Sequence, residues 1–181
     1  MRNKREKMKS KWKTEPSAAR VAVYGLLLAL AMVFSYVEAL IPISLGVPGV
    51  KLGLANLVTM VGLYTIGVFG TVAVNLLRIV LTGFTFGNMF SMLYSLAGAV
   101  LSLLLMFLVK KSGWFSSVGV SIVGGVGHNI GQLAVAAFTV QTLGVFSYLP
   151  VLLAAGTVAG ALIGVLGGII VQRIGRLVSL S

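Results

Sequence analysis

Long apolar runs separated by short polar segments dominate the chain from residue 20 onward. A run of about twenty apolar residues is long enough to cross the hydrocarbon core of a bilayer as one α-helix. Such helices are expected at about 20–41, 89–109, 115–140 and 149–171. The pattern therefore predicts an all-α integral membrane protein.

The run at 52–83 is ambiguous because it is too long for one ordinary span. It could form one long tilted helix, or two short helices joined by a hinge near Gly67–Gly70. Basic residues favour the cytoplasmic side of a membrane, and the basic N-terminal tail and Lys110–Lys111 share that side only if 52–83 crosses twice. We therefore predict six transmembrane helices with both termini in the cytoplasm. Each half of the run has only about fifteen residues, so we expect these two helices to be buried, partly broken or set in thin membrane.

The predicted organisation has three parts. Residues 1–19 form a basic cytoplasmic tail, residues 20–176 form the six-helix transmembrane domain, and residues 177–181 form a C-terminal tail. No repeat or second domain is visible.

Small residues recur at every fourth position in two of the predicted spans. Spacing of this kind places them on one face of a helix, where they let two helix backbones approach closely. The residues are Gly156, Gly160, Gly164 and Gly168 in the last span, and Gly127 and Gly131 in the span before it. We therefore expect a compact bundle.

The composition supports a multi-pass protein of the cell membrane. Hydrophobic residues make up 58% of the chain and charged residues 9%, against about 25% charged in an ordinary soluble domain. The net charge of +11 arises largely from the tail, because eight of the 14 Lys and Arg residues lie within residues 1–20. Such a tail indicates orientation and contact with anionic lipid headgroups. No basic face or aromatic platform follows it, which argues against a nucleic-acid partner.

Polar side chains within the spans gather in the half of the bundle that is predicted to face outward. A charged side chain at the centre of a span costs about 2.5–3.5 kcal/mol, so such residues are kept for a partner or a function. His128, Asn129 and Gln132 are spaced so that all three can point into one site. The predicted substrate-binding residues are Glu38, Lys51, Asn56, Arg78, His128, Asn129 and Gln132.

The charges of this set favour a small anionic ligand, such as a carboxylate or phosphate, in an outward-facing pocket. Structural interpretations stay open. Arg78 could form a structural salt bridge with Glu38, and His128 could be an interhelical hydrogen-bonding residue. Lys51 could mark the membrane boundary. Asn88, next to Gly87, is expected to be a turn or cap residue.

The residues argue against an enzyme. The chain has three acidic residues, one histidine and no cysteine, which leaves no Asp-rich magnesium site and none of the usual zinc ligand sets. It also has no phosphate-binding glycine loop followed by Lys, so it does not hydrolyse ATP by itself. We therefore predict no catalytic residue, no metal and no cofactor.

Three segments carry a resemblance to a known family: PGVKLGLANLVTMVGLY (Pro48–Tyr64), GNMFSMLYSLAGAVLS (Gly87–Ser102) and VSIVGGVGHNIGQLAVAA (Val120–Ala137). With SYVEALIP and YLPVLLAAG, the chain resembles the Gx transporter family from the first span onward. Members of that family are often labelled heptaprenyl diphosphate synthase component I. The family is similar in size and organisation to the S components of energy-coupling-factor transporters.

That resemblance implies a six-helix S-component-like bundle with a ligand pocket near the outer surface. It also implies partners: a membrane coupling subunit and cytoplasmic ATPases. Small residues on the first helix would contact the coupling subunit, here Ala22, Gly25 and Ala29, although Gly25 departs from an alanine-only pattern. The first hypothesis is therefore a substrate-binding subunit for uptake. The second is a non-catalytic accessory protein of prenyl-diphosphate metabolism, and the third is a solitary ion-coupled carrier.

Overall fold

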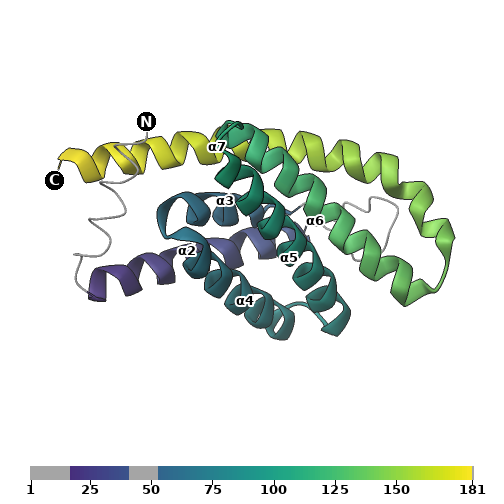
Figure 1. Ribbon diagram of the computed structural model, residues 1–181. Coiled ribbons are helices and arrows are strands. Elements are labelled where there is room, and N and C mark those ends of the chain that lie inside the picture. Colours follow the sequence, from purple (N-terminus) through teal and green to yellow (C-terminus); the bar gives the residue numbers. More distant parts are fainter. Residues whose placement is uncertain (1–16, 41–52, 181) are drawn as a thin grey trace.

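The computed structural model describes residues 17–40 and 53–180, and these residues form helices joined by short connections, with no strand among them. Lys51 and residues 1–16 of the tail predicted at 1–19 lie outside the described residues, whereas residues 17–19, also predicted as tail, belong to a helix. The helices are α2 (Ser17–Leu40), α3 (Asn56–Thr65), α4 (Gly67–Thr85), α5 (Met89–Ser112), α6 (Ser117–Val140), the 3₁₀ helix η1 (Leu143–Tyr148) and α7 (Leu149–Leu180). The all-α prediction is confirmed for the described residues (Figure 1).

Five helices of the described chain are long and apolar enough to cross a membrane, namely α2, α4, α5, α6 and the η1–α7 segment. The remaining helix, α3, has 10 residues. At 1.5 Å per residue it is about 15 Å long, half of a hydrocarbon core about 30 Å thick. Eight residues of α3 are buried. The expectation of a short, buried helix in the first half of the 52–83 run therefore holds, whereas α4 has a span's length.

The break in that run lies at the start of the predicted hinge. Ile66 ends α3, and Gly67 begins α4 with φ at +81°, a backbone conformation that glycine adopts without a Cβ clash. The end of α3 is also held by α5, because the Lys110 ammonium donates a hydrogen bond to the Leu63 carbonyl. The same ammonium lies 4.2 Å from the centroid of the Tyr64 ring.

Contacts between helix ends distinguish two ends of the bundle. At one of them, which we call the polar end, the Gly53 N–H donates to the Glu38 carboxylate near the end of α2. At the other, the basic end, Lys110 meets Leu63 at the end of α3. The short α3 therefore returns the chain from the polar end to the basic end.

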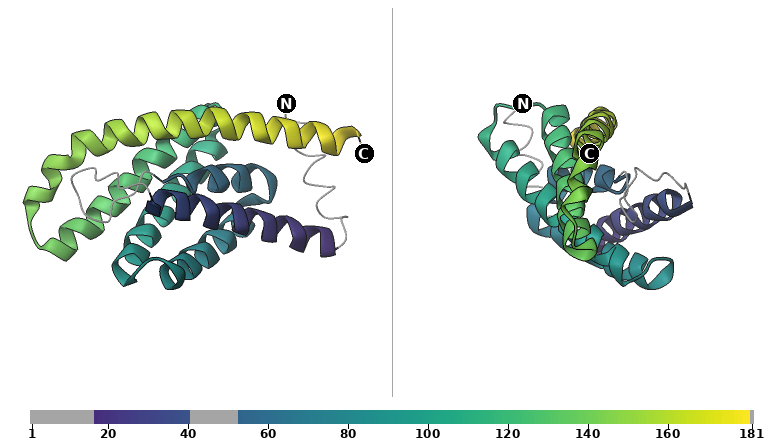
Figure 2. Two further views of the ribbon diagram at one scale, coloured as in Figure 1. Left: turned by 180° about the vertical axis from the view of Figure 1, so that it is seen from behind. Right: turned by 90° about the vertical axis from the view of Figure 1, so that its right-hand side faces the viewer.

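The start of α2 and the end of α7 lie at the basic end as well. Tyr24 of α2 is so close to Gly70, near the start of α4, that a Cβ on Gly70 would come 2.6 Å from its hydroxyl. Tyr24 also packs, with Val171 and Ile174 of α7, against one hydrophobic cluster. Figure 2 shows α7 running along the molecule and ending on the same side of it as the start of α2. Both ends of the described chain therefore share one end of the bundle.

Glycine brings α6 and α7 together as the four-residue spacing predicted. A Cβ on Gly160 would lie 2.6 Å from the Ile122 Cα, and one on Gly164 would lie 2.7 Å from the Val118 Cα. On the other side of α6, a Cβ on Gly131 would lie 2.6 Å from the Ala97 carbonyl oxygen of α5. These backbones are in near contact, so α6 is clamped between α5 and α7.

The helices differ in how deeply they are packed. Of the most apolar window in each span, 56% is buried in α6 but 17% in α2, so α6 is central and α2 peripheral. Helix α7 continues to Leu180, so residues 177–180, predicted as part of a tail, are helical. Asn88 caps α5 through a reciprocal pair of hydrogen bonds with Ser91, which confirms its predicted role.

Candidate functional site

Arg78 is the buried cation of the polar end. It lies on the second half of α4 with 5% of its surface exposed. Its Nη1 donates to the Ser35 hydroxyl of α2 at 3.4 Å, and its charge interacts with that of Glu38. Its Nε has no hydrogen-bond partner among the described residues. The guanidinium therefore has an N–H donor that the contact between α2 and α4 does not use. A purely structural salt bridge to Glu38 would not need this donor.

Glu38 connects α2 to the turn before α3. Its carboxylate accepts a hydrogen bond of 2.5 Å from the Gly53 N–H. Gly53 has φ at +83°, and a Cβ there would lie 2.6 Å from the Asn56 Nδ2 and 3.2 Å from the His128 Cδ2. Glycine is therefore needed at this position for both conformation and space. Through this turn, Glu38 is placed next to Asn56 and His128.

His128 and Gln132 lie on one face of α6, as their spacing predicted. The His128 Nε2 and the Gln132 Nε2 are 3.0 Å apart in a hydrogen bond. His128 is 4% exposed and Gln132 is fully buried. Gly98 of α5 leaves room for the imidazole, because a Cβ there would lie 2.7 Å from two ring atoms.

Asn129 points in another direction from this pair. Its Nδ2 donates to the Leu152 carbonyl of α7 at 2.7 Å. Gly156 of α7 makes room for this amide, since its Cβ would lie 3.0 Å from the Asn129 Nδ2. Asn129 is 100° away from His128 on the helix, so it reaches α7. The expectation that all three polar residues of α6 point into one site is thus met by two of them.

The structure brings together five of the seven predicted binding residues. They come from α2, α3, α4 and α6: Glu38, Asn56, Arg78, His128 and Gln132. Glu38, Asn56 and His128 lie at Gly53, whereas Gln132 is linked through its bond to His128 and Arg78 through its interaction with the Glu38 charge. We call them the polar cluster. Lys51 lies outside the described residues, two positions before Gly53.

The polar cluster suits an anion better than a metal. It offers a guanidinium Nε and the Asn56 Nδ2, both without hydrogen-bond partners among the described residues. Donors of this kind match carboxylate and phosphate oxygens. In the described part of the chain, no three His, Cys, Asp or Glu residues are grouped so that they could hold a metal ion.

The residues expected to contact a coupling subunit lie on the outside of α2. Ala22, Gly25 and Ala29 are all exposed, and a Cβ on Gly25 would meet nothing within 4 Å. Large apolar residues, among them Leu26 at 60% and Val33 at 56% exposure, extend this surface. A side chain at Gly25 would therefore point away from the described helices.

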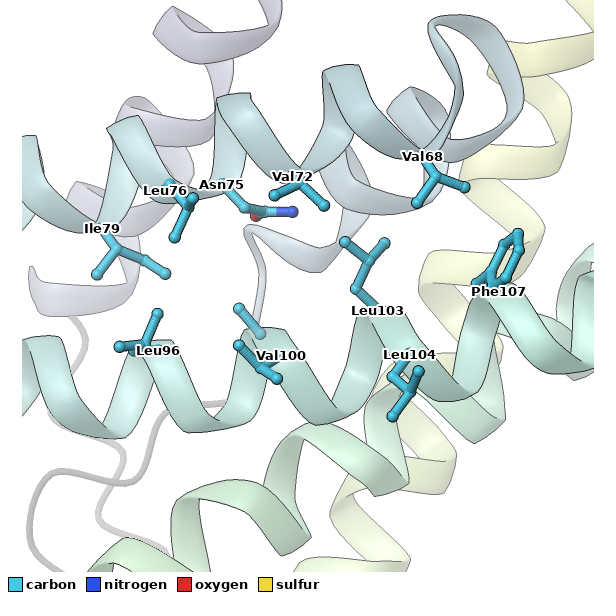
Figure 3. Close-up of a pocket in the computed structure, with 11 residues that line it drawn as sticks. Val68, Val72, Asn75, Leu76, Ile79, Leu96, Val100, Leu103, Leu104 and Phe107 are labelled. Atoms are coloured by element: carbon cyan, nitrogen blue, oxygen red, sulfur yellow. The ribbon is translucent and has the colours of Figure 1, made fainter.

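Sequence reasoning missed a second polar contact inside the bundle. The Thr59 hydroxyl of α3 donates to the Asn75 Oδ1 of α4 at 3.0 Å, and both residues are buried. Asn75 lies one helical turn before Arg78 in an otherwise apolar stretch. This isolated polar residue was the sequence signal that could have predicted the contact. It also lines a groove between α4 and α5 with a volume of about 240 Å³ (Figure 3).

Comparisons with known proteins give one family. No curated protein and no solved structure gives a significant match to the chain. A family model matches residues 27–170, which include the polar cluster, α3 and the glycine faces of α6 and α7. By this match over most of its length, the chain belongs to the heptaprenyl diphosphate synthase component I family.

Proposed function

We propose that the protein is the substrate-binding subunit of an uptake transporter of the energy-coupling-factor type. One observation carries this proposal: contacts link Glu38, Asn56, Arg78, His128 and Gln132 of four helices into one cluster, with Glu38, Asn56 and His128 at Gly53. Ionisable groups in a membrane interior are costly and mark substrate sites or structural pairs. The remaining donor capacity at Arg78 and Asn56 favours the substrate site.

The orientation in the proposal follows from the two ends of the bundle. Lys110, Lys111 and Arg173 lie toward the basic end, where α5 and α7 finish. Because basic residues prefer the cytoplasm, we assign the basic end to the cytoplasmic face of the membrane and the polar cluster to the outer face. With α3 as a short sixth helix, both termini are cytoplasmic. Substrate then enters from outside.

The proposed substrate is a small anionic molecule. Among the residues predicted from the sequence to bind substrate, Arg78 and Lys51 outnumber Glu38, and amides complete the donor set. Because the chain has no nucleotide-binding loop, uptake against a gradient requires energy from an ion gradient or from partners. The proposed partners are a membrane coupling subunit and cytoplasmic ATPases, and the subunit itself catalyses no reaction.

The direct test is to purify the protein in mild detergent and identify the retained small molecule by mass spectrometry. A carboxylate- or phosphate-bearing molecule, bound one per chain, supports the proposal. Reconstitution with coupling and ATPase subunits should then give ATP-dependent accumulation of that molecule in vesicles. Accumulation driven by an ion gradient without these subunits would instead establish a solitary carrier.

The exposed face of α2 gives a prediction about assembly. Gly25→Trp or Ala29→Trp should prevent co-purification with the coupling subunit while leaving retention of the small molecule unchanged, because these positions face outward. Leu162→Trp is the matched control, because Leu162 is also well exposed, at 62%, but lies on α7 rather than on α2. Co-purification and ligand retention are measured on the same preparations. Loss of the small molecule from an intact complex would show that this face of α2 contributes to substrate binding instead of contacting the coupling subunit.

A second function is favoured by the family description. As a non-catalytic accessory component of heptaprenyl diphosphate synthase, the chain would hold a catalytic subunit at the membrane. Affinity purification separates the two proposals. A prenyl synthase subunit recovered in place of coupling and ATPase subunits would support the accessory role.

A further inference from the structure

His128 is the single histidine of the chain, and its ring is enclosed near the middle of α6. A Cβ on Gly53, in the turn before α3, would lie 3.2 Å from the ring Cδ2. A Cβ on Gly98 of α5 would lie 2.7 Å from both Cε1 and Nδ1. Two glycine backbones therefore border the imidazole, and the ring cannot turn or shift without moving α5 or this turn.

The amide of Gln132 selects the form of this ring. The Gln132 Nε2 and the His128 Nε2 are 3.0 Å apart. An amide nitrogen donates and does not accept, so the ring nitrogen facing it must accept and cannot carry a proton. The imidazolium, or a neutral ring with its proton on Nε2, would set one N–H group against another. The neutral ring with its proton on Nδ1 is the form that makes this bond.

The charged groups around the ring are consistent with a neutral imidazole. From α2, the Glu38 carboxylate reaches the turn beside the ring and accepts a hydrogen bond from the Gly53 N–H. Its negative charge interacts with the guanidinium of Arg78 on α4, so it does not require a second cation. On α5, Tyr94 lies one turn before Gly98 and packs in an apolar cluster. Helix α6 has no titratable residue besides His128.

We propose that Gln132 is a positioning residue that holds His128 as the neutral tautomer with its proton on Nδ1. The role of this pair in recognition rests on the proposed function. In that site His128 acts as a hydrogen-bonding group, and Arg78 is the cation of the polar cluster that meets the negative charge of the substrate. Binding of the anion then requires no proton on His128 between about pH 6 and pH 8, where an ordinary histidine changes its charge.

The test is ¹⁵N NMR of the full-length protein in phosphatidylcholine nanodiscs at about pH 7. The protein is labelled with ¹⁵N-histidine and purified with a tag that contains no histidine, so both ring signals come from His128. We expect one protonated and one unprotonated ring nitrogen, assigned through their bonded carbons to Nδ1 and Nε2. The Nδ1–H form should exceed the Nε2–H form about tenfold, the effect of one hydrogen bond.

Two variants test the part played by Gln132. Gln132→Met keeps an unbranched side chain without the amide, and the excess of the Nδ1–H form should disappear. Asn129→Leu is the matched control, because it removes a buried amide from the same helix that donates to the Leu152 carbonyl instead. The control should give the wild-type ratio.

A wild-type ring with its proton on Nε2, or with both nitrogens protonated, would overturn the proposal. An unchanged ratio in Gln132→Met would also overturn it. The wild-type spectrum needs no variant and does not depend on whether a variant folds. If the purified protein retains no anionic molecule but shows the Nδ1–H form, the proposed function fails and the assignment of the tautomer stands. Retention together with the other tautomer would reject the role of Gln132 alone.

Discussion

Arg78→Gln is expected to abolish retention of the anionic molecule that co-purifies with the protein. Arg78 is buried, reaches Ser35 and Glu38, and keeps a donor without a partner in the described chain. Hydrogen bonds to charged groups contribute about 1.5–3 kcal/mol, so affinity should fall about ten- to hundredfold. The amount of ligand per protein, measured by mass spectrometry, gives the result.

Two controls separate binding from folding in this experiment. Arg173→Gln removes the same charge from an exposed position near the end of α7 and should leave retention unchanged. The double variant Arg78→Gln, Glu38→Gln removes the charge left without its counterion. If the Arg78–Glu38 interaction is only structural, the double variant recovers thermal stability and Arg78→Gln retains the ligand once folded. Retention at the wild-type level in folded Arg78→Gln would rule out the pocket.

Gly160→Val is expected to cause the largest loss of stability among single substitutions in α7. The first added carbon would lie 2.6 Å from the Ile122 Cα and 2.7 Å from the Ser121 carbonyl oxygen, both backbone atoms of α6. Backbone cannot move aside as a side-chain tip can, so α6 and α7 must separate. Overpacking typically costs about 1–3 kcal/mol, and separation of two helices belongs at the upper end of that range or beyond.

The matched control for this prediction is Gly25→Val. It makes the same substitution within a helix, but nothing lies within 4 Å of the new Cβ. Unfolding in a denaturing detergent, followed by circular dichroism, compares the two variants. If Gly160→Val unfolds at the same detergent fraction as Gly25→Val, close packing of α6 on α7 does not stabilise the protein.

Sequence periodicity was a reliable guide to the helices because a span depends on local composition. A membrane helix satisfies its own backbone hydrogen bonds, so a run of apolar residues is sufficient to predict it. The break at Gly67 and the cap at Asn88 were likewise predicted from neighbouring residues. The length of α3 was not predicted, because the residues before Asn56 are also apolar. Its start depends on the turn at Gly53, which contacts Glu38 and His128.

For the polar residues as well, the sequence predicted some features and not others. Their enrichment in one half of the bundle was visible once the spans and their directions were known, because polar groups stand out in apolar runs. Their partners were not visible. Asn129 bonds the Leu152 carbonyl, and Asn75 bonds Thr59. Each of these contacts joins two different helices, through residues 16 positions apart for Asn75 and Thr59 and 23 positions apart for Asn129 and Leu152.

The sequence alone determined that this is an apolar, multi-helix chain, where most of its spans lie, and which side chains are costly to keep in a membrane. Those properties follow from single residues and short spacings. The tertiary structure decided that Glu38, Asn56 and His128 meet at Gly53, with Gln132 bonded to His128, and that Asn75 bonds Thr59 inside the bundle. The reason is physical: the direction of a buried polar side chain is set by the neighbours it meets across helix interfaces, and spacing along one helix does not contain those neighbours.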